Sequence, residues 1–167
     1  MILVKKLSGV EMKTYIVSFF GHRDFDRHIK YEDKVKLIIK RLLGEKEIVE
    51  FLVGRNGEFD KFAASMVRTV RKETCRDNSF LTCVLPYATA EYQNNIEEYE
   101  SYYDSVEVCE SAERAHFKKS IEIRNKEMVE RADLIICYVT KNTGGAYRAL
   151  KYATDLEKKI VNLIETQ

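Results

Sequence analysis

The sequence TYIVSFFGHRDFD occupies residues 14–26, and its apolar first half gives way abruptly to a polar segment that begins Gly21-His22-Arg23. Residues 15–20 form a short run rich in β-branched and aromatic residues, a pattern that favours a strand buried on both faces. The polar segment would then follow the carboxyl end of that strand. In open α/β sheets ligands bind at this edge, beside a topological switch point. We therefore predict a ligand site here, in which Gly21 lets the backbone approach the ligand and His22 and Arg23 supply donors.

The composition limits the kinds of partner. The chain has 167 residues and a mass of 19.5 kDa, with 28 basic and 27 acidic residues and a formal net charge of +1. This balance provides no electrostatic footprint for nucleic acid or an anionic membrane, so any site for a polyanion must be local. The four cysteines form no CxxC pair, which favours structural thiols in a reducing cytosol. No apolar stretch approaches the roughly 18 residues of a membrane span. We expect a cytoplasmic protein with no metal, cofactor or membrane partner.

Strand-like and helical patterns alternate along the chain. Strands are expected at residues 47–53, 79–85, 105–109, 133–139 and 159–164. Helical periodicity is found at residues 31–42, with Gly44 as the stop, and at residues 59–70, 90–104, 112–131 and 146–153. Because parallel strands need crossovers, the predicted fold class is α/β, a doubly wound, mostly parallel sheet of about five or six strands with helices on both faces. We predict an N-terminal arm or edge element at residues 1–13 and a single domain at residues 14–167.

Three of the expected strands end in loops that contain glycine and precede a helix. Besides the Gly21 loop, these are Gly54-Arg55-Asn56-Gly57 and Thr143-Gly144-Gly145. Backbone N–H groups and helix dipoles from such loops can converge on one anion. A single loop would be weak support, since glycine after a strand is often only a turn residue. Three loops together predict a phosphate or nucleotide site.

These segments resemble the SLOG superfamily, a Rossmann-like group that includes the DNA-processing protein DprA, the Lonely-guy phosphoribohydrolases and the YpsA/YoqJ-like proteins. The last group is the closest match. The resemblance covers about residues 14–163 and rests on SFFGHRD, on VGRNGEFDKFAA, and on IRNKEMVERADLIICYV followed by TGGAYRALKYA. It implies that these segments form the walls of one pocket for a nucleotide or a nucleotide-derived ligand.

The resemblance also carries individual residues. Gly21, His22 and Arg23 match the first loop of the family. Further matches are Gly54, Gly57 and Asp60 in the second glycine motif, the pair Arg124 and Asn125, and Gly144 and Gly145 in the third loop. The family usually has paired glycines where this chain has Gly54-Arg55. Arg55 is therefore a candidate to point its guanidinium at the ligand in place of a close backbone approach.

One further departure bears on catalysis. In Lonely-guy enzymes the arginine works with a glutamate shortly after the third loop, but residues 146–149 here contain no carboxylate. Cleavage of an N-glycosidic bond ordinarily needs a carboxylate at the ribose. Asp60 and Arg124 are the candidate catalytic residues, and Asp24 or Glu58 could also supply a carboxylate. We therefore expect ligand binding with slow turnover or none.

Three functions remain open. The first is a module that binds or senses a nucleotide or an ADP-ribose-like signal, within stress, phage or defence biology as the resemblance implies. The second is a phosphoribohydrolase or N-glycosidase that acts on nucleoside monophosphates. The third is a DprA-like nucleic-acid binder or a scaffold, which the near-neutral charge disfavours. The sequence leaves open the identity of the ligand and whether the chain forms a homo-oligomer.

Overall fold

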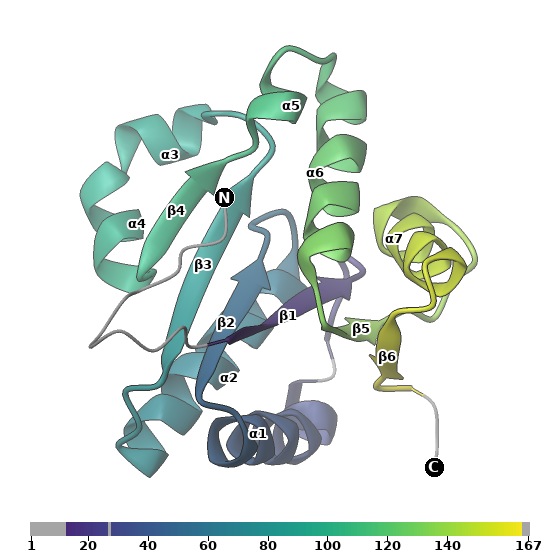
Figure 1. Ribbon diagram of the computed structural model, residues 1–167. Helices are drawn as coiled ribbons and strands as arrows, with labels where there is room; N and C mark the ends of the chain where they lie inside the picture. The colour runs from purple at the N-terminus through teal and green to yellow at the C-terminus, as the bar shows by residue number, and fades with distance from the viewer. Residues whose placement is uncertain (1–12, 27, 165–167) are drawn as a thin grey trace.

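The computed structural model describes residues 13–26 and 28–164, and these contain a six-stranded sheet in the order β4-β3-β2-β1-β5-β6 (Figure 1). All of its strand pairs are parallel. The strands are β1 (Thr14–Gly21), β2 (Ile48–Val53), β3 (Ser79–Leu85), β4 (Ser105–Val108), β5 (Leu134–Tyr138) and β6 (Lys159–Asn162). The α/β, Rossmann-like, doubly wound class predicted from the sequence is confirmed.

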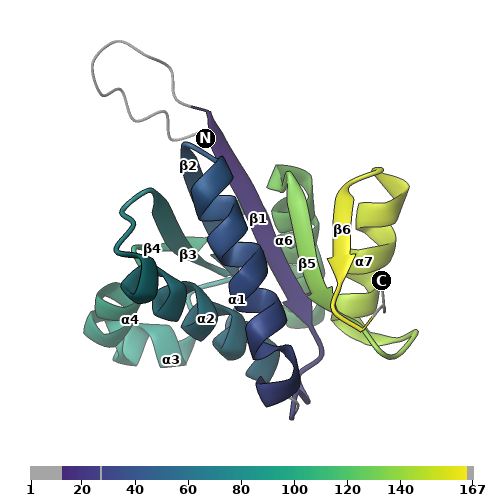
Figure 2. The ribbon, with the colours of Figure 1, turned by 90° about the horizontal axis from the view of Figure 1, so that it is seen from below.

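Helices cover both faces of this sheet (Figure 2). They are α1 (His28–Glu45), α2 (Glu58–Thr74), α3 (Ala90–Asn94), α4 (Ile96–Tyr102), α5 (Glu110–Glu113), α6 (Phe117–Arg131) and α7 (Gly144–Asp155). Helices α1, α2 and α4 contribute to one core, and α6 and α7 contribute to the other. Because α7 buries only alanines, Ala146, Ala149 and Ala153, it can approach the sheet closely.

Strand β1 lies inside the sheet, as predicted, between β2 and β5. Its side chains alternate between the two cores: Val17 and Phe19 point to the α1/α2 side, and Phe20 points to the α6/α7 side. The chain runs outward from β1 through β2 and β3 to β4, and then returns to the other side of β1 to form β5. The topological switch point therefore lies between β1 and β5, where ligands bind in sheets of this kind.

Two predicted helices differ from the observed ones. Gly44 does not stop α1, because that helix continues to Glu45. A Cβ atom at Gly44 would have no described atom within 4 Å, so the packing does not require glycine there. The helix predicted at residues 90–104 is two short helices separated at Asn95, whose amide donates to the Glu91 carbonyl and so competes with helical pairing. Ile96, the first residue of α4, is 42% exposed.

The helix predicted at residues 112–131 is also divided, into α5 and α6. The Ser120 hydroxyl bonds the carbonyl oxygens of Ala115 and His116, at 2.9 and 3.2 Å, and this stabilises the break before α6. The predicted arm at residues 1–13 lies outside the described residues except for Lys13. Within residues 13–26 and 28–164, no helix is long and apolar enough to cross a bilayer.

Candidate functional site

The loops after β1 and β5 are joined by one side chain. His22 Nε2 accepts hydrogen bonds from the backbone N–H groups of Thr140, at 3.0 Å, and Lys141, at 3.2 Å. Burial and the nearby Lys141 lower the pKa of His22, and Asp24 opposes that change. A neutral imidazole suits this geometry, since only an unprotonated nitrogen can accept. His22 therefore fastens the two loops that flank the switch point.

The loop after β2 packs directly on the first loop. The Glu58 N–H donates to the Arg23 carbonyl over 3.1 Å, and a Cβ atom on Gly57 would lie 2.6 Å from Arg23 Cα. Gly21 was predicted to let the backbone approach a ligand. In the structure it faces the Phe59 ring, because a Cβ atom there would lie 2.2 Å from that ring. Glycine at both positions makes room for the protein's own packing.

Arg124 lies behind these loops. It is 3% exposed, and its Nη1 donates to the Val84 carbonyl over 2.6 Å, while its Nε has no partner among the described residues. A Cβ atom on Gly54 would lie 2.7 Å from Arg124 Nη1 and 2.8 Å from Asp60 Oδ2. Gly54 therefore separates a buried cation from the carboxylate that faces it.

The Asp60 carboxylate has a local structural task. Its Oδ2 accepts the Asn56 N–H over 2.9 Å, which ties the loop to the first turn of α2. Burial raises the pKa of Asp60, and the charge of Arg124 and the Asn56 N–H oppose that rise. Burial likewise lowers the pKa of Arg124, against the pull of Asp60. Because Asn56 and Glu58 already donate within the protein, the N-terminus of α2 is less open to a ligand anion than the sequence predicts.

An open cleft of about 220 Å³ lies at the carboxyl edge of the sheet. Its lining comes from the first three strand-to-helix loops and from the start of α6: Arg23, Asn56, Pro86, Tyr87, Thr89, Phe117 and Ile121. The Tyr87 and Phe117 rings meet edge to face with centroids 6.1 Å apart, and Phe117 is 51% exposed. The sequence analysis singled out only Arg23 and Asn56 of this set. The loop after β3 contains no glycine, and Pro86 at the end of β3 was the available signal.

The guanidinium of Arg55 does not enter this cleft. It lies against Tyr103 Oη and Glu91, both 3.2 Å away, and stacks over the Tyr99 ring at 4.7 Å. These contacts join the loop after β2 to α3 and α4. The sequence-based proposal that Arg55 turns toward a ligand is therefore not supported by its position in the structure.

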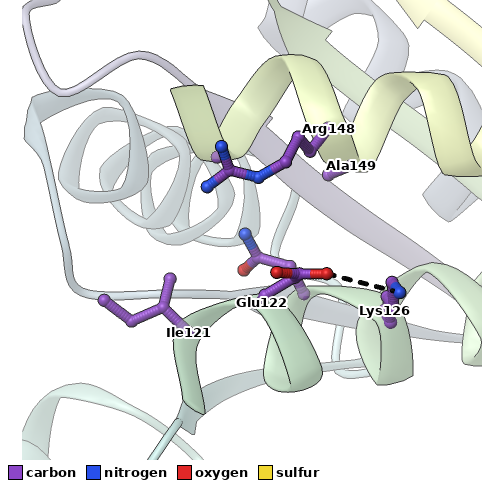
Figure 3. A pocket seen from close by; sticks show the side chains of 7 residues that line it. Ile121, Glu122, Lys126, Arg148 and Ala149 are labelled. Carbon is purple, nitrogen blue, oxygen red and sulfur yellow. Dashed lines mark ion pairs between the residues drawn. The ribbon is translucent and has the colours of Figure 1, made fainter. Parts of the chain in front are cut away.

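The third loop borders a second, narrower pocket between α6 and α7, with a volume of about 30 Å³. Asn125 and Gly145 line it together with Glu122, Lys126, Arg148, Ile121 and Ala149. Figure 3 shows Arg148 of α7 extending above Glu122 of α6. Thr143 and Gly144 are exposed beside it, and Gly144 has φ +90°, a backbone conformation that favours glycine. Ile121 belongs to both pockets, so they adjoin along α6.

No family model and no curated protein matches the chain. Solved structures do. Similar structures include DNA processing protein A (DprA) from Streptococcus pneumoniae, with TM-score 0.62, 14% identity, and coverage of 88% of this chain and 49% of that one. The chain has a DprA-like fold. DprA from Helicobacter pylori, whose structure is described as giving insight into a single-stranded DNA binding mode, is similar with TM-score 0.58, 14% identity, and coverage of 87% and 63%.

The structural-genomics target TM1055 has the same fold, with TM-score 0.58, 12% identity, and coverage of 87% of this chain and 72% of that one. This chain spans about half the length of the pneumococcal DprA. At these identities the similarity concerns the fold alone. The carboxyl edge of β1, β2 and β5 lies where the sequence analysis expected it.

Nine of the thirteen predicted site residues fall into three groups. Outside these groups are four residues whose places are given above: His22, Arg55, Thr143 and Gly144. Arg23 and Asn56 line the larger cleft, and Asn125 and Gly145 line the adjoining pocket. The remaining inward residues, Gly21, Gly54, Gly57, Asp60 and Arg124, support the loops from behind. Among residues 13–26 and 28–164, no cluster of three or more His, Cys, Asp or Glu side chains could hold a metal ion.

Proposed function

We propose that the protein binds an anionic, nucleotide-like small molecule in the cleft formed by Arg23, Asn56, Tyr87 and Phe117, and turns it over slowly or not at all. The supporting observation is the chemistry of the lining. A cationic side chain, an amide and a pair of aromatic rings converge at the carboxyl edge, and none of the seven lining residues carries a carboxylate. Kinship with the YpsA/YoqJ-like group is part of this proposal.

Each part of the lining suits one part of a nucleotide. Arg23 is exposed and can make a charge-assisted contact with a phosphate. The half-exposed Phe117 ring offers a face on which a base can stack, an interaction worth about 1–3 kcal/mol. Asn56 is placed for polar contact with a sugar or a base edge. Phosphate and base would thus bind on opposite walls of the same cleft.

Hydrolysis of an N-glycosidic bond is less well supported. The reaction needs a carboxylate at the ribose, and Asp60 Oδ2 already accepts the Asn56 N–H from behind the loop. Arg124, the other candidate catalytic residue, is buried and is absent from the lining of the cleft. Rapid release of adenine from AMP by the purified protein would overturn the proposal and favour the phosphoribohydrolase alternative.

A thermal-shift screen with AMP, GMP, CMP, UMP and ADP-ribose tests the proposal. A ligand that binds only the folded protein at 100 times its Kd adds about 2.7 kcal/mol of stability. For a chain of this size that corresponds to a rise in Tm of roughly 5–10 °C. Absence of a shift with every one of these compounds at millimolar concentration would overturn the proposal.

Single-stranded DNA binding is the second candidate, and the exposed Phe117–Tyr87 pair in an open cleft favours it. The Helicobacter pylori DprA, similar in fold, is described as binding single-stranded DNA. Aromatic stacking does not require a strongly basic chain, although phosphate contacts make binding dependent on salt. An affinity for oligo(dT) that falls steeply between about 50 and 200 mM salt would support this candidate over a small nucleotide.

A further inference from the structure

The larger cleft leaves little room for a ligand longer than one nucleotide. Its volume is about 220 Å³, whereas pockets for small molecules usually hold about 300–1,000 Å³. A ligand longer than one nucleotide must therefore extend beyond the cleft. Such a ligand can extend past Ile121, because this residue lines both the cleft and the pocket between α6 and α7.

The pocket beyond Ile121 has an excess of positive charge. Glu122 is its one carboxylate, and it pairs with Lys126 at 3.4 Å and with Lys119 at 3.7 Å. Arg148 lies above the same carboxylate in Figure 3, yet no hydrogen bond or ion pair of its guanidinium occurs among the described residues. Lys126 lowers the pKa of Glu122, and Arg148 acts on this carboxylate through its charge and helps to lower that pKa. A second anion can therefore bind Arg148 without breaking a hydrogen bond or an ion pair of its guanidinium.

The pocket is small, and an exposed arginine lies on its wall. Its volume of about 30 Å³ is that of roughly one water molecule. Arg148 is exposed, however, so its guanidinium can move outward and coordinate an entering group. The stretch of α6 from Phe117 to Lys126 covers about 13 Å at roughly 1.5 Å per residue. A ligand whose base stacks on Phe117 therefore needs a further phosphate, beyond its own nucleoside, to reach Lys126.

Resting on the function proposed above, we infer that the ligand carries two phosphates separated by a nucleoside, as in a 5′-phosphorylated dinucleotide, and that Arg148 and Lys126 bind the second phosphate. The first nucleotide occupies the cleft at Arg23 and Phe117. The ligand then passes over Ile121 into the groove between α6 and α7. Arg148 thus determines the length of ligand that the protein prefers.

Isothermal titration with AMP and with the dinucleotide pApA tests this inference. The wild-type protein should bind pApA at least roughly tenfold more tightly than AMP, and Arg148→Ala should remove that advantage without changing the affinity for AMP. Arg23→Ala should weaken the binding of both AMP and pApA. Lys72→Ala, which removes an exposed cation from the far half of α2, is the matched control for net charge and should change neither affinity.

The outcomes separate this inference from the proposed function. If AMP binds in an Arg23-dependent manner but pApA binds no better, only the second phosphate site is wrong. If Arg148→Ala weakens AMP as much as pApA, Arg148 acts in the first site, and the inference is likewise overturned. If neither compound binds, both proposals fail. If affinity rises further with every added nucleotide beyond the second, the ligand is single-stranded nucleic acid and not a dinucleotide.

Discussion

His22 Nε2 accepts the Thr140 N–H over 3.0 Å, and this bond joins the loops at the ends of the two strands that flank the switch point. The same nitrogen accepts from Lys141, so a single ring atom satisfies two consecutive N–H groups of the third loop. The ring must then carry its proton on Nδ1. A residue that the sequence suggests as a ligand donor thus has, first of all, a structural acceptor role.

This geometry predicts a pH-dependent stability. Burial and Lys141 lower the pKa of His22 from its ordinary value of 6.5, so the folded state binds the proton more weakly than the unfolded chain does. The contribution of the neutral ring is therefore complete above about pH 6.5 and is lost as the pH falls through that value toward the lowered pKa. Urea unfolding of the wild type and of His22→Gln between about pH 5 and 8 should show a stability difference that shrinks on acidification. A difference that stays constant over this range would contradict the prediction.

The close packing around Gly54 predicts that adding one methyl group there destabilises the protein. A methyl group there would lie 2.7 Å from Arg124 Nη1 and 2.8 Å from Asp60 Oδ2. Gly54→Ala should therefore destabilise the protein by about 1–3 kcal/mol, as overpacked cores usually do. Denaturant unfolding measures this loss.

Gly44→Ala is the matched control. Glycine at that position lies in α1, and no described atom would contact the added methyl group within 4 Å. The exchange should stabilise the protein by about 0.4–1 kcal/mol, because alanine restricts the unfolded chain. Equal effects of the two substitutions would show that Gly54 does not separate Arg124 from Asp60 in the way described.

The contributions of Arg124 and Asp60 to the free energy of unfolding should be coupled. Arg124→Met removes the positive charge that stabilises the ionised Asp60 carboxylate. This substitution should lower the free energy of unfolding by about 1–3 kcal/mol. Asp60→Asn should cost a similar amount, since it leaves Arg124 without a counter-charge. The double variant should cost less than the sum, with a coupling energy of about 0.5–3 kcal/mol. Strict additivity would mean that the two side chains do not interact.

The sequence predicts the framework of the site better than its lining. Strand β1 could be predicted because its residues are apolar on both faces, and the glycines at or after the ends of β1, β2 and β5 indicated which edge of the sheet to examine. Chain order then places these loops together, because parallel strands end at the same edge. None of this requires knowledge of tertiary contacts.

The direction of individual side chains could not be predicted in this way. Arg124 lies on a highly charged helix, where periodicity alone does not distinguish a buried guanidinium from a solvated one. Arg55 follows a glycine in a loop, and its turn toward Glu91 depends on α3, which is distant in sequence. Tyr87 and Phe117 meet only when the loop after β3 reaches the start of α6. Such contacts depend on tertiary packing, for which local patterns carry no signal.

Arg23 gives the most direct test of the ligand site. Its backbone carbonyl holds the second loop through the Glu58 N–H, but its side chain is exposed at the cleft. Arg23→Ala therefore keeps the loop contact and removes only the cation. A charge-assisted contact to phosphate is worth about 1.5–3 kcal/mol, so binding of AMP should weaken roughly 10- to 150-fold while the urea midpoint hardly changes. Arg23→Lys should retain part of the affinity, because a point charge remains while the forked geometry is lost. Titration calorimetry and unfolding of the same preparations give both quantities, and an unchanged affinity in Arg23→Ala would place the phosphate elsewhere.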